Sequence, residues 1–195
     1  MIQRRTVVVL LAAGAGTRFD GDGHKLSAHL PDGDPRTVIE RSLANALAAA
    51  VGPVVVVTGA VADVVPAGLR ELVTVCHNPR WADGQMTSLR SGIDAARALA
   101  ATDVVVGLAD QPFVEPAAWR AVAEHDGPIA VATYAGQRAN PVKLAAEVWD
   151  LLPVAGDEGA RALMRVRPEL VREVACTGSP ADIDTTEDLR RWQSN

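Results

Sequence analysis

The feature that most constrains the fold is an apolar run, Thr6 to Ala13, that ends abruptly in a glycine-rich turn. The run is rich in Val and Leu without polar alternation, which is typical of a strand buried on both faces of a parallel sheet. Gly14 and Gly16 free the backbone to turn tightly and let its N–H groups approach an anion. Arg18 and Lys25 follow, and two cations here suit the oxygens of a triphosphate. The segment therefore predicts a central strand that leads into a nucleoside triphosphate site.

Other phosphate-binding turns begin in the same way but fit these residues less well. In the dinucleotide-binding fingerprint the third glycine falls where this chain has Phe19, and no acidic residue ends the next expected strand, 54–58. A Walker P-loop ends in Gly-Lys-Ser/Thr, which neither Thr17-Arg18 nor His24-Lys25-Leu26 provides. The remaining alternative is a plain strand-to-helix turn that binds no ligand.

Composition narrows the class of protein. The 195 residues are 48% hydrophobic and 22% charged, so the chain can bury a full core, and we expect residues 1–195 to form a single domain. The net charge of −5 gives no basic field for nucleic acid. The first apolar run is too short for a membrane span and no secretory cleavage pattern follows it, which favours a cytoplasmic protein that acts on small molecules. Cys76 and Cys176 stand alone and are expected to be reduced structural thiols.

Strand-like and helix-like segments alternate along the chain. The expected strands are 6–13, 53–58, 72–76, 103–108 and 128–133, and the expected helices are 36–51, 61–70, 86–101 and 115–125. This alternation predicts an α/β fold built from βαβ units around a mostly parallel sheet. The glycine- and charge-rich stretch 20–35 predicts a mobile surface loop with the character of a lid.

An acidic residue follows the expected strand 103–108. Ligands of open α/β sheets bind beyond the carboxyl ends of the strands, which is where Asp110 falls. A carboxylate there suits Mg²⁺, which takes one or two carboxylates together with phosphate oxygens and waters. We therefore expect a second acidic ligand from elsewhere in the chain.

The tail provides the candidates for that second ligand. Alternation places Asp182 and Asp184 on one face and Ile183 on the other, while Thr185 or Thr186 has the character of a helix N-cap. Asp184 is the expected ligand, and Asp182 keeps two interpretations, a ligand or a turn residue.

The segment before the expected helix 86–101 is a further candidate contact for the nucleotide. Gly84 to Ser88 would bring backbone amides and hydroxyls to the same sheet edge, where they suit a base or a ribose. The equal alternative is an ordinary N-cap, in which Thr87 or Ser88 serves the helix alone.

Five motifs are spread over nearly the whole chain. They are Leu11-Ala-Ala-Gly-Ala-Gly-Thr-Arg with Lys25, Ala109-Asp-Gln-Pro, Gly136-Gln-Arg-Ala-Asn-Pro-Val, Gly156-Asp-Glu-Gly-Ala-Arg-Ala-Leu and Asp182-Ile-Asp-Thr-Thr-Glu-Asp-Leu. Together they resemble the MobA-like NTP transferases, and within them the molybdenum cofactor cytidylyltransferase branch. The resemblance implies a three-layer α/β/α, Rossmann-like nucleotidyltransferase fold with a mostly parallel sheet.

The same resemblance implies a reaction and its residues. A nucleotidyl group, CMP from CTP or the unit of another NTP such as GTP, would pass to the phosphate of a molybdopterin-type cofactor with release of pyrophosphate. Arg18, Lys25 and Asp110 would be catalytic, and Asp110 with Asp184 would bind Mg²⁺. The nucleotide- and cofactor-binding residues would be Leu11, Ala12, Ala13, Gly14, Ala15, Gly16, Thr17, Arg18, Lys25, Gly84, Ser88 and Asn140. The resemblance also places Asn140 and residues 156–159 against the acceptor.

Partners and alternatives complete the expectation. The partners would be a nucleoside triphosphate and a phosphorylated pterin, with a molybdoenzyme or a cofactor chaperone as a protein partner, and neither nucleic acid nor membrane. The loop between Arg18 and Lys25 is longer and more acidic than is usual in such proteins. The alternatives are the same fold acting on a sugar phosphate, polyol phosphate or phospholactate, and a non-catalytic protein that binds and delivers the cofactor.

Overall fold

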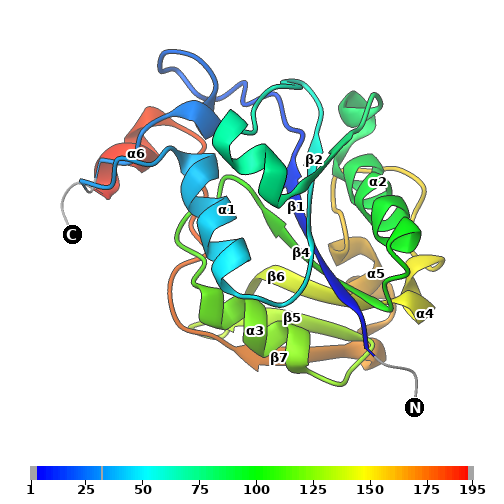
Figure 1. Ribbon diagram of the computed structural model, residues 1–195. Helices are drawn as coiled ribbons and strands as arrows, with labels where there is room; N and C mark the ends of the chain where they lie inside the picture. Colours follow the sequence, from blue (N-terminus) through cyan, green and yellow to red (C-terminus); the bar gives the residue numbers. More distant parts are fainter. Residues whose placement is uncertain (1–3, 32, 193–195) are drawn as a thin grey trace.

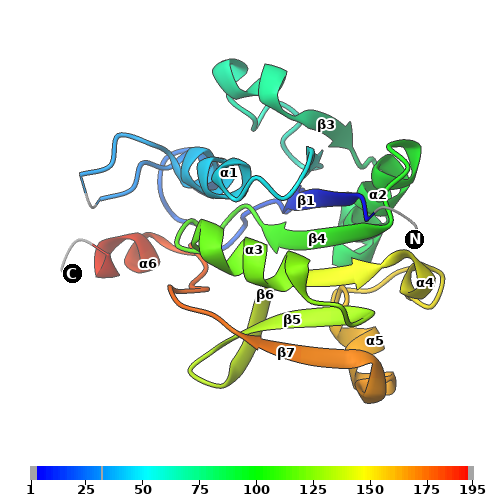
Figure 2. The same ribbon diagram turned by 60° about the horizontal axis from the view of Figure 1, so that its bottom comes forward.

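A seven-stranded sheet in the order β3-β2-β1-β4-β6-β5-β7 forms the centre of the protein. The computed structural model describes residues 4–31 and 33–192. All strand pairs are parallel except those of β6 with β4 and with β5, and Figure 2 shows β6 between these two neighbours. The strands are β1 (Thr6–Ala12), β2 (Val54–Thr58), β3 (Thr74–His77), β4 (Asp103–Leu108), β5 (Ile129–Tyr134), β6 (Gln137–Ala145) and β7 (Val171–Ala175). The predicted mostly parallel α/β fold is confirmed.

Helices cover both faces of this sheet (Figure 1). One core holds buried side chains of α1 and α3, and the other holds those of α2, α4 and α5. The helices are α1 (Val38–Ala48), α2 (Gln85–Ala98), α3 (Pro116–Glu124), α4 (Ala146–Trp149), α5 (Arg161–Val166) and α6 (Thr186–Arg191). Within the described residues, no helix has the length and apolar character needed to cross a membrane.

Strand β1 lies in the middle of the protein, as its apolar run predicts. Val8 and Leu10 pack into the α1–α3 core, whereas Val7 and Val9 pack into the opposite core, and all four side chains are fully buried. A strand buried on both faces gains from apolar residues at every position, which explains the absence of polar alternation. The loop that leaves β1 therefore starts from a fixed point in the core.

Strands β6 and β7 were not predicted from the sequence. Strand β5 turns into β6 through Ala135 and Gly136, whose φ angles are 49° and 79°. Two positive φ angles in a two-residue connection match the twist of paired antiparallel strands. Ala-Gly is a weak signal for a hairpin, because alanine seldom adopts the positive φ that this turn requires.

The predicted helix over 61–70 is wrong. This stretch instead contains a 3₁₀ segment, η2 (Ala67–Leu72), preceded by the buried residues Val64 and Val65. Pro66 donates no backbone hydrogen bond and Gly68 destabilises a helix interior, so an α-helix cannot run through this segment.

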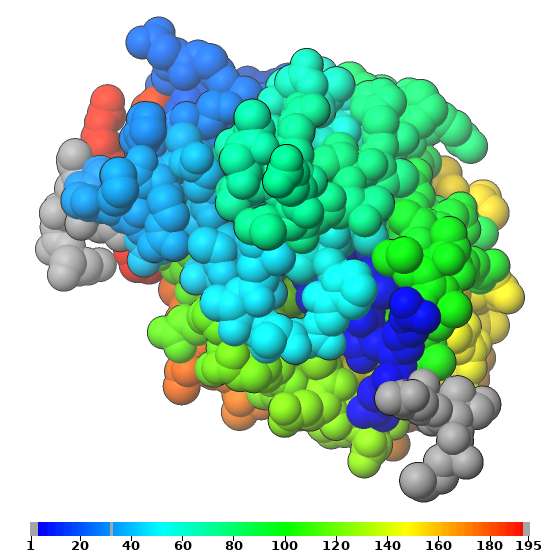
Figure 3. Space-filling model, in the orientation of Figure 1, coloured from blue at the N-terminus to red at the C-terminus, as the bar shows by residue number. Residues whose placement is uncertain are grey.

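The predicted surface loop over 20–35 is wrong in its middle. Leu26 and Leu30 are only 2% and 4% exposed, and a short 3₁₀ segment, η1 (Lys25–Ser27), passes between the core and the site. The first part does lie on the surface, where the Thr186 hydroxyl donates to Asp20 at 2.7 Å. Figure 3 shows this blue segment and the red tail side by side at one edge of the molecule. That the loop moves as a lid stays a prediction.

Candidate functional site

The site begins where β1 and β4 end side by side. Leu11 and Leu108 are register partners in these parallel strands, and the Ala109 N–H donates to the Leu11 carbonyl at 2.9 Å. The glycine turn leaves β1 at this edge, and Asp110 follows β4 at the same edge. Two segments far apart in sequence are therefore brought together by parallel pairing alone.

Lys25 lies between the two carboxylates that were predicted to bind metal. Its Nζ is 2.6 Å from Asp110 Oδ2 and 2.7 Å from Asp184 Oδ1. The other oxygen of Asp184 accepts from Arg18, with Nη2 at 2.8 Å from Oδ2. Residues predicted from three separate motifs thus form one connected cluster.

The charges of this cluster are strongly coupled. Burial by itself would lower the pKa of Lys25, but the charges and hydrogen bonds of Asp110 and Asp184 outweigh it and raise this pKa. Burial raises the pKa of Asp110, Lys25 opposes that effect, and the neighbouring carboxylates Asp182 and Asp184 reinforce it. The carboxylates therefore create a site that favours positive charge, which Lys25 supplies in this structure.

The tail positions Asp184 through the residues on either side of it. Ile183 is fully buried, and its N–H donates to the Asp110 carbonyl at 2.8 Å. Thr185 is the N-cap of α6 and forms a capping box with Asp188, confirming the predicted cap at this position. Asp184 is therefore fixed between an anchored strand-like residue and a helix start.

One oxygen of Asp110 has no partner among the described residues. Asp110 Oδ1 is buried and accepts no hydrogen bond, and a buried carboxylate oxygen without a donor is costly unless a cation or water satisfies it. Within the described part of the chain, no group of three or more His, Cys, Asp or Glu residues could hold a metal ion. Two carboxylates are nevertheless enough for Mg²⁺ or Mn²⁺ when phosphate oxygens and waters complete the shell. The residues present fit a divalent ion shared with a nucleotide.

A cavity of 310 Å³ opens beside this cluster. Most residues predicted to bind the nucleotide line it: Leu11, Ala12, Ala13, Gly14, Ala15, Lys25, Gly84 and Ser88, together with Asp110. Gly16, Thr17 and Arg18 do not line it, and the Arg18 side chain is 75% exposed. Arg18 therefore lies at the outer edge of the site, within reach of Asp184 but open to solvent.

His24 holds the glycine turn, a role that the sequence analysis did not assign. Its Nε2 is 3.1 Å from the Gly14 carbonyl, and its Nδ1 is 3.3 Å from the Leu26 N–H. Because the Leu26 N–H donates to Nδ1, the proton of the neutral ring is on Nε2, which donates to Gly14. A Cβ at Gly16, whose φ is 63°, would approach Nε2 to 3.1 Å. Glycine suits this position, because a side chain here would need a positive φ and would crowd the ring.

The N-cap interpretation of Thr87 or Ser88 is wrong. Gly84 is the N-cap of α2, with φ 106° and no side-chain capping bond. Ser88 is buried on the cavity wall, and its hydroxyl accepts from the Asn78 side chain at 3.0 Å. The same amide nitrogen donates to Thr87 at 2.9 Å. Asn78, another residue that the sequence analysis did not assign, therefore fixes the wall on which Ser88 lies.

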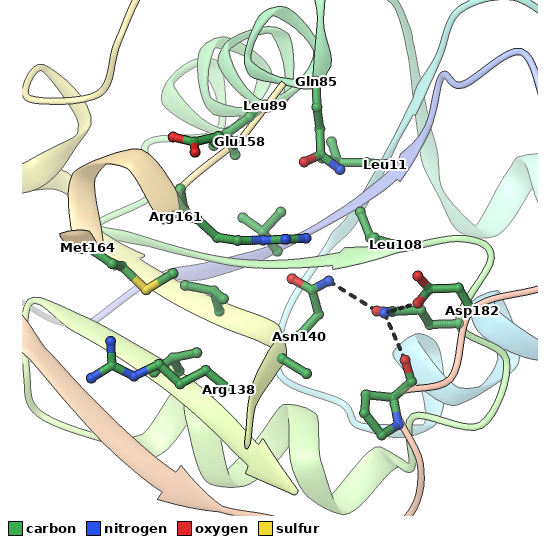
Figure 4. A pocket seen from close by; sticks show the side chains of 18 of the residues that line it. Leu11, Gln85, Leu89, Leu108, Arg138, Asn140, Glu158, Arg161, Met164 and Asp182 are labelled. Atoms are coloured by element: carbon green, nitrogen blue, oxygen red, sulfur yellow. Dashed lines mark hydrogen bonds between the residues drawn. The ribbon is translucent and has the colours of Figure 1, made fainter. Parts of the chain in front are cut away.

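A second and larger cavity of 570 Å³ adjoins the first (Figure 4). Leu11, Gln85 and Leu108 line both, so the two cavities share a wall. Asn140 lies here and not beside the glycine turn. Asp182 also lies here, where it accepts from Gln111 at 2.6 Å, and it does not contact Lys25. The tail thus presents Asp184 to the cluster and Asp182 to the larger cavity.

The fold is the Rossmann-like α/β fold of nucleotidyltransferases. The whole chain is similar in structure to a nucleotidyl transferase from Methanothermobacter thermautotroptrophicus, Mth528, with a TM-score of 0.82 and 26% identity over 97% of this chain and 96% of that one. It is also similar to Rv0371c from Mycobacterium tuberculosis H37Rv, with a TM-score of 0.78 and 27% identity over 98% and 99% of the two chains.

Residues 8–174 match the MobA-like NTP transferase domain, and the chain therefore belongs to this family. A relative from Paenarthrobacter nicotinovorans, the protein named Nicotine blue oxidoreductase, is 34% identical over 197 residues, which are 94% of each chain. A further structure of Rv0371c is a complex with manganese, and it matches the fold with a TM-score of 0.69 and 24% identity over 98% and 99% of the chains.

Proposed function

We propose that this protein is a divalent-metal-dependent nucleotidyltransferase that transfers CMP from CTP to the phosphate of a molybdopterin-type cofactor. The single observation that carries the proposal is the bridge formed by Lys25 between Asp110 and Asp184, beside a glycine turn and at the edge of two adjoining cavities. One cavity would take the nucleotide and the other the acceptor. Family membership supports the reaction type, and the motif resemblance supports the acceptor.

Asp110 and Asp184 are the residues that would hold the metal. The unpartnered Oδ1 of Asp110 and the oxygens of Asp184 are hard ligands suited to Mg²⁺ or Mn²⁺. When bound, the ion would neutralise triphosphate charge and polarise the reacting phosphate. The manganese complex of Rv0371c agrees with a divalent ion in a protein of this fold.

The protein's own task is to position two phosphates and to balance charge. An oxygen of the acceptor phosphate would attack the α-phosphorus, a new P–O bond would form, and the bond to the β-phosphate would break to release pyrophosphate. Lys25 and Arg18 would exchange their carboxylate partners for triphosphate oxygens and stabilise the departing pyrophosphate. The backbone of Ala12 and Ala13 and the hydroxyl of Ser88 would contact base and ribose. No protein nucleophile is needed.

A thermal shift panel tests the donor. The purified protein is melted with Mg²⁺ or Mn²⁺ and each of CTP, GTP, ATP, UTP, NAD and NADH. A ligand at about 100 times its dissociation constant stabilises by about 2.7 kcal/mol, which in a chain of this size raises the Tm by roughly 5–11 °C. A metal-dependent shift with CTP supports the proposal. If another triphosphate gives the shift, that triphosphate and not CTP is the donor. If none of the triphosphates gives a shift, nucleotidyl transfer is overturned.

An assay of pyrophosphate release tests the acceptor once the donor is known. Pyrophosphate release is measured with the best donor and molybdopterin, and then with a sugar phosphate, a polyol phosphate and phospholactate. Release with molybdopterin alone supports the cofactor acceptor, whereas release with another phosphate assigns the same chemistry to that compound. Binding of the cofactor without release would favour delivery to a molybdoenzyme or chaperone. On the proposed function the protein works in the cytoplasm.

The name of the 34% identical relative favours a second candidate, an oxidoreductase. The larger cavity would then take a small organic substrate and the smaller one part of a nicotinamide dinucleotide. A Tm shift with NADH, without any metal-dependent shift from a triphosphate, would support this candidate over the transferase.

A further inference from the structure

Three arginines line the larger cavity, and two of them are held by glutamates. Arg138 Nε is 2.7 Å from Glu173, and Arg165 forms a bidentate pair with Glu158 at 2.7 and 2.6 Å. A guanidinium that already holds a carboxylate with two parallel hydrogen bonds has little left to offer a ligand. Arg165 is therefore occupied, and Arg138 is partly occupied through its Nε.

Arg161 differs from both. Its side chain makes no hydrogen bond or ion pair with any residue in the described parts of the chain, although it lines the cavity. Figure 4 shows its side chain extending from α5 across the cavity toward Leu108, which lies on the wall shared with the smaller cavity. The charge of Arg161 acts on Glu158 at a distance, where it helps Arg165 to keep the pKa of that carboxyl low. A guanidinium with free donors over an apolar cavity is suited to an anionic group on a ligand.

The opposite end of the cavity carries amides whose orientation is fixed. The Gln111 nitrogen donates to the Pro180 carbonyl at 2.9 Å and to Asp182 at 2.6 Å, so its oxygen must face Asn140. That oxygen accepts from the Asn140 nitrogen at 3.1 Å. The side-chain oxygen of Asn140 is consequently turned away from Gln111, as Figure 4 shows. This end therefore presents acceptors, the Asn140 oxygen and the second oxygen of Asp182, to whatever enters.

Apolar walls lie between these two ends. They consist of side chains from β4, β5, β6, α2 and α5, namely Val106, Leu108, Val131, Val142, Leu89 and Met164. Such walls suit a flat ring system better than a polyol, because a polyol would leave its hydroxyl groups without partners there.

We propose that Arg161 binds the anionic group of the second substrate and that Asn140, oriented by Gln111, binds an N–H edge of the same molecule. The substrate class is a planar amino-heterocycle that carries a phosphate or a carboxylate. The inference rests on the proposed function, since it deepens the acceptor side of that site. It assigns Arg161 as a specificity-determining residue.

Two fluorescent probes test the anion contact. Pterin-6-carboxylate carries a planar amino-heterocycle and an anion, and 6-hydroxymethylpterin carries the same ring without the charge. Dissociation constants are measured by fluorescence quenching with the full chain and without any nucleotide. The wild type is expected to prefer the carboxylate by about tenfold or more, as a charge-assisted bidentate bond allows. Arg161→Gln is expected to remove this preference.

Arg165→Gln is the matched control because Arg165 lines the same cavity but is already paired. It is expected to keep the preference for the carboxylate. Equal affinity of the wild type for both probes, or a preference that survives in Arg161→Gln, would overturn the assignment. A preference lost in both variants would also overturn it, because the effect would then come from the general charge of the rim.

Asn140→Leu tests the other end separately. It is expected to weaken both probes by about tenfold while the ratio between them stays that of the wild type. Unchanged affinity for both probes would remove Asn140 from the proposal. These measurements involve no nucleotidyl transfer, so an absence of turnover would overturn the proposed function and leave the probe ratios as the separate test of Arg161.

Discussion

The ammonium group of Lys25 lies 2.6 Å from the carboxylate of Asp110, with both side chains less than one-fifth exposed. This contact joins the loop after β1 to the end of β4, and a second carboxylate, Asp184, completes the bridge. The Lys25 ammonium thus lies between the two acidic residues proposed to bind metal. A bound metal would take the two carboxylates from Lys25, and the nucleotide phosphates would then pair with the Lys25 ammonium. Binding of the metal and binding of the nucleotide would therefore be coupled.

Replacing Asp110 tests the metal site. Asp110→Asn is expected to lower turnover by about 100-fold or more, because metal-assisted charge stabilisation is lost. The Tm should change by only a few degrees, since Lys25 keeps Asp184. Asp150→Asn is the control, because Asp150 is 83% exposed and pairs with Arg97 on the surface. Normal metal-dependent turnover in Asp110→Asn would contradict the assignment.

Replacing Lys25 tests the competition between ammonium and metal. Lys25→Met leaves two carboxylates facing each other and is expected to cost about 2 kcal/mol without metal, or roughly 4–8 °C in Tm. Mn²⁺ should then raise the Tm of the variant more than that of the wild type. Arg18→Gln removes a cation that also contacts Asp184 but is 75% exposed, so its cost should stay below about 1 kcal/mol. Equal Mn²⁺ shifts in Lys25→Met and wild type would refute the competition.

Replacing His24 tests the support of the glycine turn. His24→Ala removes the bond to the Gly14 carbonyl and is expected to weaken binding of the nucleoside triphosphate by about tenfold, measured by calorimetric titration. His29→Ala removes a comparable bond, from His29 Nδ1 to the Pro35 carbonyl at 3.0 Å. Its effect should be confined to stability. If both variants bind the triphosphate equally well, His24 does not position the turn for the ligand.

Replacing Gly84 tests the junction between α2 and the loop at 156–159. Its φ is 106°, and an added Cβ would lie 2.7 Å from the Gly156 carbonyl oxygen. Gly84→Ala is therefore expected to cost about 2 kcal/mol or more, or roughly 4–8 °C in Tm. Gly68→Ala is the control, because a Cβ there meets nothing within 4 Å; it should be neutral or stabilise by up to about 1 kcal/mol. Thermal unfolding that does not separate the two variants would argue against strain at Gly84.

Sequence patterns within single segments predicted several elements of this structure. The unbroken apolar run predicts β1, because both faces of a doubly buried strand contact apolar side chains. The alternation Asp182-Ile183-Asp184 predicts a buried Ile183 between two polar residues, because successive side chains of an extended chain point in opposite directions. Features that depend on the residue pattern within one segment were therefore predictable from the sequence.

Other elements depended on distant partners. Strand β6 pairs antiparallel with β4, and a propensity read along the chain says nothing about that choice. His24 has an ordinary sequence context, and its role appears only when η1 folds back onto the Gly14 carbonyl. Asn78 likewise gains its role from the two hydroxyls of α2. No local pattern encodes these contacts, because each joins segments that approach only in the folded chain.

By itself the sequence determined the central strand, the glycine turn and the types of charged residue at the site. Only the tertiary structure decided that Lys25 would bridge Asp110 and Asp184, that Asp182 would turn to the other cavity, and that the Arg161 side chain would have no partner among the described residues. The physical reason is that residue type and backbone geometry act locally, whereas the pairing of charges depends on which chain segments the core packs together.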